Sequence, residues 1–181
     1  MVYFYKRRMA METVVLVDNH DLKCGVLEKL AAHEQGLLHR AVSGFVINEK
    51  KEMLLQQRAL CKYHTPGIWS NTVCSHPREG ESVLAAVTRR LSEEMGMTAN
   101  FKEVGHIIYK VSFSNGLIEH EYDHVFVAKY DGQDINPNPE EVASYRWISR
   151  NDLISEIKQY PEKFSPWMQL IIQQDFMKEY F

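Results

Sequence analysis

Residues 82–96 have the sequence SVLAAVTRRLSEEMG, which contains the clearest helix signal of the chain. Ser82 is a favourable N-cap residue, and Gly96 stands where glycine commonly ends a helix. One face of this helix carries an apolar residue at every fourth position: Val83, Val87, Leu91 and Met95. We expect this face to pack on the core. The other side then presents two arginines and two glutamates: Arg89, Arg90, Glu93 and Glu94.

Short β-like runs lie on both sides of this helix. Upstream, strands are expected at residues 13–17, 42–48, 53–58 and 69–73, with a turn at 48–52 that makes a hairpin of the second and third. Downstream, strands are expected at 101–113 and 119–130, which flank the turn 114–116, and at 145–149. Residues 27–34 form either a helix or an irregular segment. Two C-terminal helices are expected, one from Asn151 or Asp152 towards Tyr160 and one from Ser165-Pro166 to about Tyr180. This mixture predicts an α/β (α+β) fold with a mixed β-sheet sandwiched between helices.

The composition is typical of a soluble globular protein. The chain has 181 residues, of which 45% are hydrophobic and 25% charged. A net charge of -3 gives no basic field of the kind that attracts nucleic acid. The apolar runs are also far shorter than the roughly 20 residues of a membrane span. We therefore expect neither a nucleic acid nor a membrane partner.

The cysteines and the N-terminus indicate a cytoplasmic protein. Three cysteines form no pairing framework and suit a reducing compartment: Cys24, Cys61 and Cys74. Residues 1–10 are expected to be a flexible N-terminal extension, and residues 11–181 a single domain. The physiological start is open between Met1, Met9 and Met11.

The run N-T-V-C-S-H-P at residues 71–77 is the first pattern with chemical potential. Cys74 and His76 are two residues apart, so on a strand end they point the same way. The imidazole could then hold a metal whose field favours the thiolate. The alternative is a buried structural cysteine beside a surface histidine.

Residues 119–121, E-H-E, form the second pattern. On a strand Glu119 and Glu121 share one face, and two neighbouring carboxylates either repel each other or share a cation. An exposed charged edge strand is the alternative. Together with His33, His39 and His76 the two glutamates would form an N₃O₂ site with one position left open.

The third pattern is basic. Arg90 and Glu94 lie one helical turn apart, and the simple interpretation is an ion pair. The alternative is a diphosphate clamp in which Glu94 holds Mg²⁺ and Arg90 faces phosphate oxygens. Arg58 and Lys62 could complete such a clamp, or they could be ordinary surface residues.

The helix segment resembles a Nudix box, whose pattern is G-x5-E-x7-R-E-U-x-E-E-x-G-U with U apolar. Seven positions match: Glu81, Arg89, Leu91, Glu93, Glu94, Gly96 and Met97. Two differ, because Ser75 replaces the first glycine and Arg90 replaces the glutamate of R-E-U. In Nudix hydrolases that glutamate helps to hold the catalytic metals.

These differences, with N-T-V-C-S-H-P, E-H-E and the run F-S-P-W-M at residues 164–168, resemble the type I isopentenyl-diphosphate isomerases. That family is a divergent branch of the Nudix fold. The resemblance extends over most of the chain. It implies a Nudix-like fold and an isomerase that interconverts isopentenyl and dimethylallyl diphosphate in isoprenoid biosynthesis.

The resemblance also implies roles for individual residues. One divalent metal (Mn²⁺, Mg²⁺ or Zn²⁺) would be held by His33, His39, His76, Glu119 and Glu121. A second ion, Mg²⁺ that arrives with the substrate diphosphate, would be held at Glu94 and Cys74. The diphosphate would bind Lys29, Arg58, Lys62 and Arg90. The catalytic residues would be Cys74 and Glu121 as an acid/base pair on opposite faces of the hydrocarbon, with Tyr109 assisting Glu121 and Trp167 closing over the substrate.

The alternative functions are a Nudix phosphohydrolase of nucleoside diphosphate derivatives and a non-enzymatic binding module. The sequence leaves open the metal at the histidine site and the direction of flux. A monomer or a weak homodimer is expected.

Overall fold

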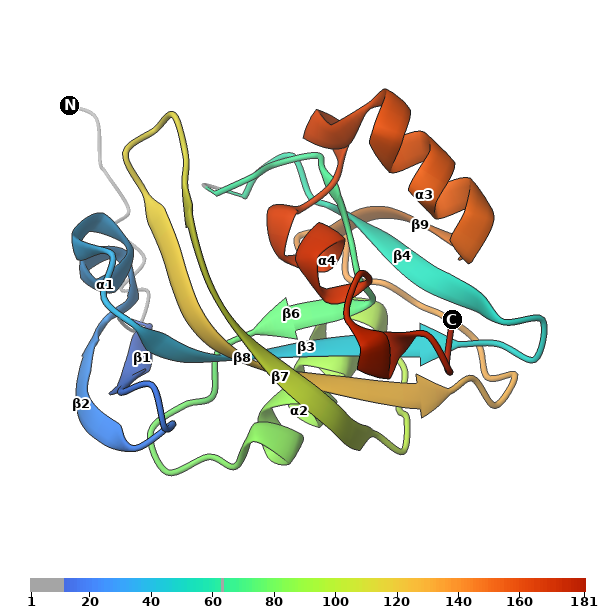
Figure 1. Ribbon diagram of the computed structural model, residues 1–181. Helices are drawn as coiled ribbons and strands as arrows, with labels where there is room; N and C mark the ends of the chain where they lie inside the picture. Colours follow the sequence, from blue (N-terminus) through green and yellow to red (C-terminus); the bar gives the residue numbers. More distant parts are fainter. Residues whose placement is uncertain (1–11, 63) are drawn as a thin grey trace, which may run out of the picture.

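A nine-stranded mixed β-sheet forms the body of the molecule (Figure 1). The structure is a computed structural model that describes residues 12–62 and 64–181, so the predicted extension 1–10 lies outside the described residues. Strand β3 (His39–Ile47) is central and runs parallel to β8 (Ile118–Lys129). Three further strands pair with β3 in the antiparallel sense: β1 (Thr13–Val17), β4 (Glu52–Arg58) and β6 (Val73–Ser75).

The remaining elements extend and cover this sheet. The other strands are β2 (Lys23–Glu28), β5 (Trp69–Ser70), β7 (Lys102–Ser112) and β9 (Val142–Ser149). The α-helices are α1 (Lys29–Gln35), α2 (Val83–Met95), α3 (Arg150–Gln159) and α4 (Pro166–Ile171). Two 3₁₀ turns, Pro161–Lys163 and Asp175–Met177, lie near the C-terminus. Among the described residues, no helix has the length and apolar character to span a membrane.

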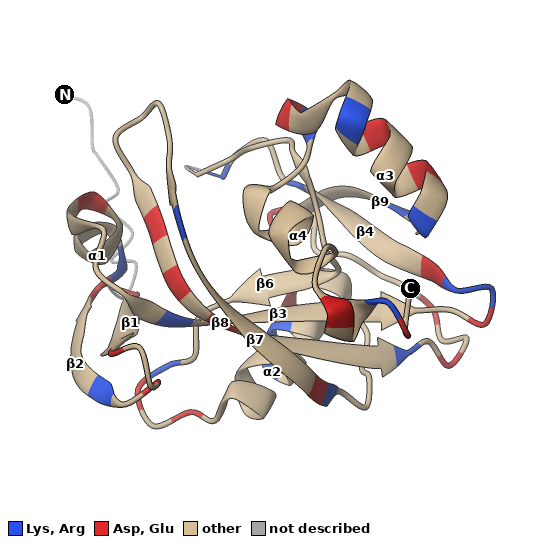
Figure 2. Cartoon of the chain, in the orientation of Figure 1, with Lys and Arg blue, Asp and Glu red and all other residues tan. Residues whose placement is uncertain are grey.

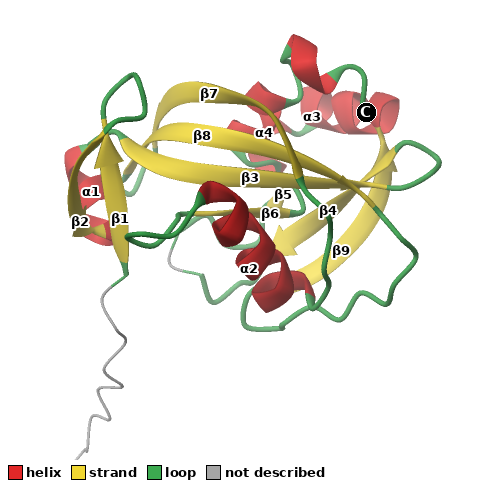
Figure 3. Ribbon diagram, turned by 90° about the horizontal axis from the view of Figure 1, so that it is seen from below, coloured by secondary structure: helices red, strands yellow, loops and turns green. Residues whose placement is uncertain are grey.

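Helices cover both faces of the sheet. Seen from below, α2 crosses one face, and α3 and α4 lie behind the sheet (Figure 3). Side chains alternate along β3, so Val42 and Val46 pack towards α2 whereas Phe45 and Ile47 join the core beneath α4. The predicted mixed sheet between helices is therefore confirmed.

Helix α2 follows its sequence prediction closely. The Ser82 hydroxyl accepts a hydrogen bond from the Ala85 amide at 3.1 Å, as an N-cap should. Gly96 ends the helix with φ +63°, and a Cβ there would lie 2.1 Å from the Asn136 carbonyl oxygen, so a side chain is excluded. Glu94 of this helix is buried, and the side chain of Gln56 on β4 donates a hydrogen bond to it.

Several strand predictions need correction. The turn at 48–52 is present, yet β3 and β4 pair only at Ile47 and Met53 because β4 turns away to pair with β9. The strand expected at 69–73 is broken at Asn71, whose side-chain amide donates to the carbonyl oxygens of Val73 and Gly44. Leu27 belongs to β2, which was not predicted, and α1 begins only after Glu28.

The C-terminal helices also differ from the prediction. Helix α3 is capped by Ser149, whose hydroxyl accepts from the Asp152 amide at 3.2 Å, and not by Asn151 or Asp152. The last helix ends at Ile171, well before Tyr180, and a 3₁₀ turn follows. The Ser165 hydroxyl makes no capping bond, since it pairs with Ser70 instead.

Candidate active site

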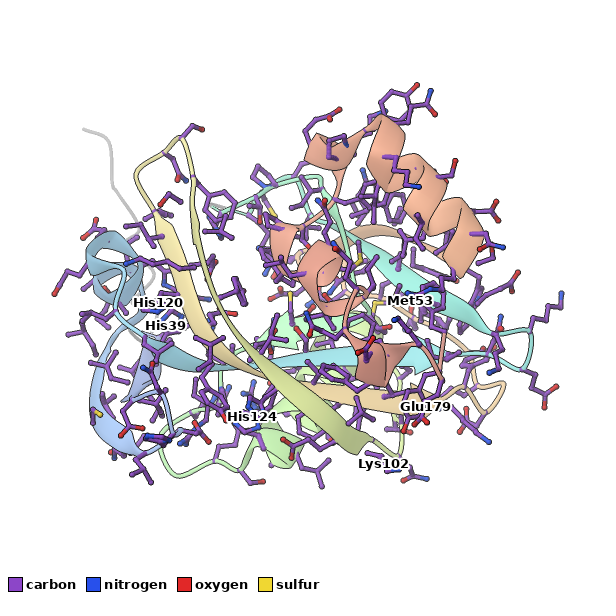
Figure 4. All side chains as sticks on the ribbon, in the orientation of Figure 1. His39, Met53, Lys102, His120, His124 and Glu179 are labelled. Carbon is purple, nitrogen blue, oxygen red and sulfur yellow. The ribbon has the colours of Figure 1, made fainter. Side chains whose placement is uncertain are left out.

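Five side chains from α1, β3, β8 and the residue after β6 converge at one end of the sheet: His33, His39, His76, Glu119 and Glu121. One candidate ligand atom from each lies within 4.8 Å of the others, and all but the half-buried His76 are buried. Figure 4 shows His39 at this end, near α1, and Met53 in the other half of the molecule. The structure thus brings together all five residues of the predicted N₃O₂ set.

Strand geometry explains the convergence. Along β8, where acidic residues recur (Figure 2), Glu119 and Glu121 point into the molecule while His120 turns to the Gly36 carbonyl oxygen, 2.9 Å from its Nδ1. The parallel register of β3 and β8 places His39 directly beside Glu121. The predicted shared face of the two glutamates is confirmed.

The histidine tautomers fit a cation. Nδ1 of His33 lies 2.6 Å from the Lys29 carbonyl oxygen, and Nδ1 of His39 lies 2.8 Å from the Leu37 carbonyl oxygen. A carbonyl only accepts, so each Nδ1 carries the proton and each Nε2 offers a lone pair, as in metal-binding histidines. The buried His39 Nε2 has no hydrogen-bond partner. Lone pairs and carboxylates that meet in one buried place suit a divalent cation.

Contacts within the cluster link each glutamate to imidazoles. His33 Nε2 lies 3.1 Å from Glu119 Oε2, and His76 Nε2 lies 2.9 Å from Glu121 Oε1. Burial and the Glu121 charge would raise the pKa of Glu119, but the contacts with His33 and His64 outweigh them and the pKa is lowered. Burial, with the nearby charges of Lys29 and His39, lowers the pKa of His76 well below its ordinary value. These two directions favour the ligand forms, an ionised carboxylate and a neutral imidazole, whereas at His33 the contact with Glu119 outweighs burial and raises the pKa.

Tyr109 and Cys74 border the cluster. The Tyr109 hydroxyl donates to Glu121 Oε2 at 2.5 Å, and burial together with the Glu121 charge raises the Tyr109 pKa well above its ordinary value. Burial raises the pKa of the Cys74 thiol to about 12. Both groups therefore carry their protons at neutral pH. Cys74 pairs with Ser43, which pairs in turn with Val125, so Cys74 lies on the same sheet face as Glu121.

Trp167 lies on this same face and is hydrogen-bonded to two neighbours. Its indole nitrogen donates to Ser70 Oγ at 3.1 Å and to Asn71 Oδ1 at 3.2 Å, and the side chain is buried. The Arg58 guanidinium carbon lies 5.9 Å from the indole ring centroid. The indole ring of Trp167 is therefore held by two hydrogen bonds, and Arg58 lies beside it.

The four predicted phosphate-binding residues are each held by protein groups, and two of them share one carboxylate. Lys29 pairs with Glu12 at 3.0 Å, and the Arg58 guanidinium donates to the His64 and Thr65 carbonyl oxygens. Lys62 pairs with Glu141, and Arg90 reaches the same carboxylate at 3.2 Å. Lys62 and Arg90 are thereby brought together.

Glu94 is shared between helix and sheet. Arg90 donates to its Oε1 at 2.6 Å, so the simple ion-pair interpretation holds, and Gln56 donates to its Oε2 at 2.7 Å. The negative charge of Glu94 is one of the influences that raise the Cys74 pKa.

Sequence analysis missed several residues of this region. His64 and Glu141 come from loops and carry no periodic signal. Asp123 continues the alternation of Glu119 and Glu121, which could have revealed it. It is buried, accepts a hydrogen bond from Ser43 at 2.8 Å, and has a pKa raised well above its ordinary value, first by burial and then by the Glu121 charge.

Comparison with known proteins decides the family. Residues 37–168 match the NUDIX domain model. The chain is 45% identical to isopentenyl-diphosphate Delta-isomerase 2 of Aromatoleum aromaticum, over 87% of this chain and 82% of that protein. The chain belongs to the isopentenyl-diphosphate Delta-isomerase family. Its identity to the isomerase of Burkholderia multivorans is 45% (90% and 92% covered) and to that of Aliivibrio fischeri 47% (86% and 90%).

Solved structures confirm the fold of this isomerase family member. DR0079 from Deinococcus radiodurans superimposes with a TM-score of 0.67 at 18% identity, covering 82% of this chain and 90% of that chain. The MutT protein from Methanosarcina mazei Go1 gives a TM-score of 0.62 at 21% identity, covering 79% and 92%. The predicted Nudix-like fold is therefore confirmed.

Proposed function

We propose that this protein interconverts isopentenyl diphosphate and dimethylallyl diphosphate. One observation carries the proposal: Glu121 lies in the His/Glu cluster, bonded to Tyr109, on the same sheet face as the protonated thiol of Cys74. A carboxylate that can accept a proton and a thiol that can donate one, on the same face and with the carboxylate beside a cation site, are what a proton-transfer isomerase needs. The relatives are named for that reaction.

The reaction moves two protons and no net electrons. Protonation of the terminal CH₂ of the alkene leaves a tertiary carbocation at C3. Loss of a proton from C2 then forms the new double bond. Cys74 and Glu121 would serve as acid and base on the two sides of the hydrocarbon, with Tyr109 holding Glu121 in place. Each such group typically contributes about 10²–10⁴-fold to the rate.

The carbocation must be kept from water. Trp167 is buried beside Ser70 and Asn71, and its indole face would stabilise a desolvated cation by about 2 kcal/mol. Its two hydrogen bonds fix the ring before substrate arrives, so no reorganisation is needed during the reaction.

The cluster of His33, His39, His76, Glu119 and Glu121 would hold one divalent cation. Bound there, the cation would orient Glu121 and tune its acidity. A Mg²⁺ at Glu94 and Cys74 would accompany the diphosphate, which Lys29, Arg58, Lys62 and Arg90 would bind. Diphosphate binding supplies remote binding energy that keeps the small prenyl group in register.

A Nudix phosphohydrolase explains the site less well. Arg90 stands where the hydrolase box has a metal-binding glutamate, and it is paired with Glu94 and Glu141. The position therefore carries positive charge. Hydrolysis would also leave Cys74 without a role.

A proton NMR time course in D₂O with isopentenyl diphosphate and Mg²⁺ tests the proposal. We expect dimethylallyl diphosphate with deuterium in the new methyl group. Release of phosphate or pyrophosphate from nucleotide substrates, with no isomerisation, would support the hydrolase instead. We further propose that the protein is cytoplasmic. We also propose that it is a monomer or a weak homodimer, which light scattering after size-exclusion chromatography tests.

A further inference from the structure

His64 contacts the cluster of candidate metal ligands although it is not one of the five predicted ligands. It lies in the loop between β4 and β5, and only 6% of its surface is exposed. Its Nε2 lies 2.7 Å from Oε1 of Glu119. The other oxygen, Oε2, lies 3.1 Å from Nε2 of His33. Both oxygens of Glu119 are therefore held by imidazoles, one from α1 and one from this loop.

The orientation of His64 is fixed by two further contacts. Its ring meets Phe113 edge-on, with centroids 4.6 Å apart and an interplanar angle of 85°. Its backbone carbonyl accepts from Arg58 Nη2 at 2.9 Å, and the next carbonyl, of Thr65, accepts from Arg58 Nε at 3.1 Å. A side chain held at its ring and at its backbone can hold its partner in turn.

The geometry distinguishes His64 from the metal ligands. The cluster whose ligand atoms lie within 4.8 Å of one another contains His33, His39 and His76 but not His64. The His64 ring centroid is 6.2 Å from that of His33, whereas the His39 centroid is 4.8 Å from it. His64 thus lies outside that cluster, with its Nε2 against Oε1 of Glu119, the carboxylate oxygen that His33 does not contact.

We propose that His64 is a positioning residue that orients Glu119 for the divalent cation. The proposal rests on the metal site of the proposed function. Holding Oε1 leaves Oε2 turned towards His33 and the cluster, so the carboxylate need not be ordered when the cation binds. Arg58, which holds the His64 backbone, is itself a proposed diphosphate ligand, so the same loop joins the two parts of the site.

Metal titration of the whole chain tests this role. Metal-free wild type, His64→Ala and His64→Gln are titrated with Mn²⁺, and free Mn²⁺ is measured by electron paramagnetic resonance. We expect His64→Ala to weaken Mn²⁺ binding about 10–100-fold, the usual effect of losing such a partner. His64→Gln should recover part of the loss, because its amide N–H can still donate to Glu119. The control His106→Ala removes an exposed histidine of β7 and should bind Mn²⁺ like the wild type.

Thermal melts of the metal-free proteins separate positioning from folding. A purely structural role would lower the melting temperature of His64→Ala and leave the Mn²⁺ affinity of the folded protein unchanged, which would overturn the proposal. Pulsed electron paramagnetic resonance counts the imidazoles bound to Mn²⁺. If the wild type shows four and His64→Gln shows three, His64 is a metal ligand, and the proposal is overturned. A wild type that binds no Mn²⁺ would overturn it as well. No prenyl diphosphate is used, so a failed isomerase assay would not be mistaken for failure here.

Discussion

The two faces of the sheet are built differently. Beneath α2 the buried side chains are mostly apolar, among them Val42, Val46, Leu91 and Phe126, although Glu94 and Gln56 are also buried there. The face beneath α4 is apolar at one end, with Phe45 and Val125, but its other end buries five candidate ligands together with His64 and Asp123. Apolar burial stabilises by itself, whereas buried polar groups must be matched with partners or ions. The face beneath α2 therefore contributes mainly to stability, whereas the face beneath α4 carries the proposed metal ligands and catalytic groups.

The largest effect is expected from the polar face. Cys74→Ala removes one of the two proposed proton carriers and should lower kcat by about 10²–10⁴-fold. Because the thiol is small and its neighbours remain, binding of the diphosphate should change little. Steady-state kinetics and calorimetry with a non-reacting diphosphate measure the two quantities. A variant with near wild-type kcat would exclude Cys74 from the mechanism.

A substitution on the apolar face should change the stability of the protein and not its catalytic rate. Leu91→Ala leaves a cavity beneath α2, where Leu91 is fully buried, and should lower the free energy of unfolding by about 2–5 kcal/mol. Urea denaturation measures this change, and kcat of the folded variant should stay near the wild-type value. Leu84→Ala is the matched control, since Leu84 lies on the same helix but is half exposed. A large loss of kcat in Leu91→Ala would contradict the division between the faces.

Removing the cation from the polar face should lower both the stability of the protein and its catalytic rate. A cation present at 100 times its dissociation constant stabilises the folded state by about 2.7 kcal/mol. Exhaustive chelation should therefore lower the melting temperature and abolish turnover, and added Mn²⁺ or Mg²⁺ should restore both. Calorimetry and kinetics on the same sample provide the test. Full activity of metal-free protein in excess EDTA would remove the metal from the proposal.

The smallest effect concerns the ion pair between Glu81, just before α2, and Arg89 of that helix. A hydrogen bond from Arg89, at 2.7 Å, is the main cause that lowers the pKa of Glu81. A folded-state pKa below the unfolded value, about 4.3, adds stability above that pH, and the gain is lost as the pH falls through the folded pKa. Glu81→Gln should therefore cost about 0.2–1 kcal/mol at pH 7 and less at pH 3.5. Urea denaturation at both values measures it, and an equal cost at both would exclude the carboxylate charge as the cause.

The sequence predicted those parts whose signal is local. Helix α2, with Ser82 and Gly96 at its ends, follows from periodicity and capping alone. The β7–β8 hairpin likewise follows from its turn, and strand alternation correctly placed Glu119 and Glu121 on one face. The ligand set and the catalytic roles came from resemblance to the family. The convergence of the five side chains agrees with that set.

Features that depend on distant partners needed the tertiary structure. The sequence left open whether Glu94 pairs with Arg90 or holds Mg²⁺, and its burial and its hydrogen bond from Gln56, 38 residues away, are seen only in the structure. The break at Asn71 arises because its amide binds backbone carbonyl groups, including that of Gly44 on β3. His64 has no neighbours in sequence that mark it, and its importance appears only where the loop meets β8.

The sequence by itself determined the family, the mixed sheet between helices, and the residue types of the site. The tertiary structure alone decided which groups hold Trp167 and Glu119 in place: Ser70 and Asn71 on Trp167, and His64 on Glu119. The physical reason is range. Capping and periodicity act within about one or two turns of chain, whereas burial and side-chain hydrogen bonds join residues that the sequence keeps far apart.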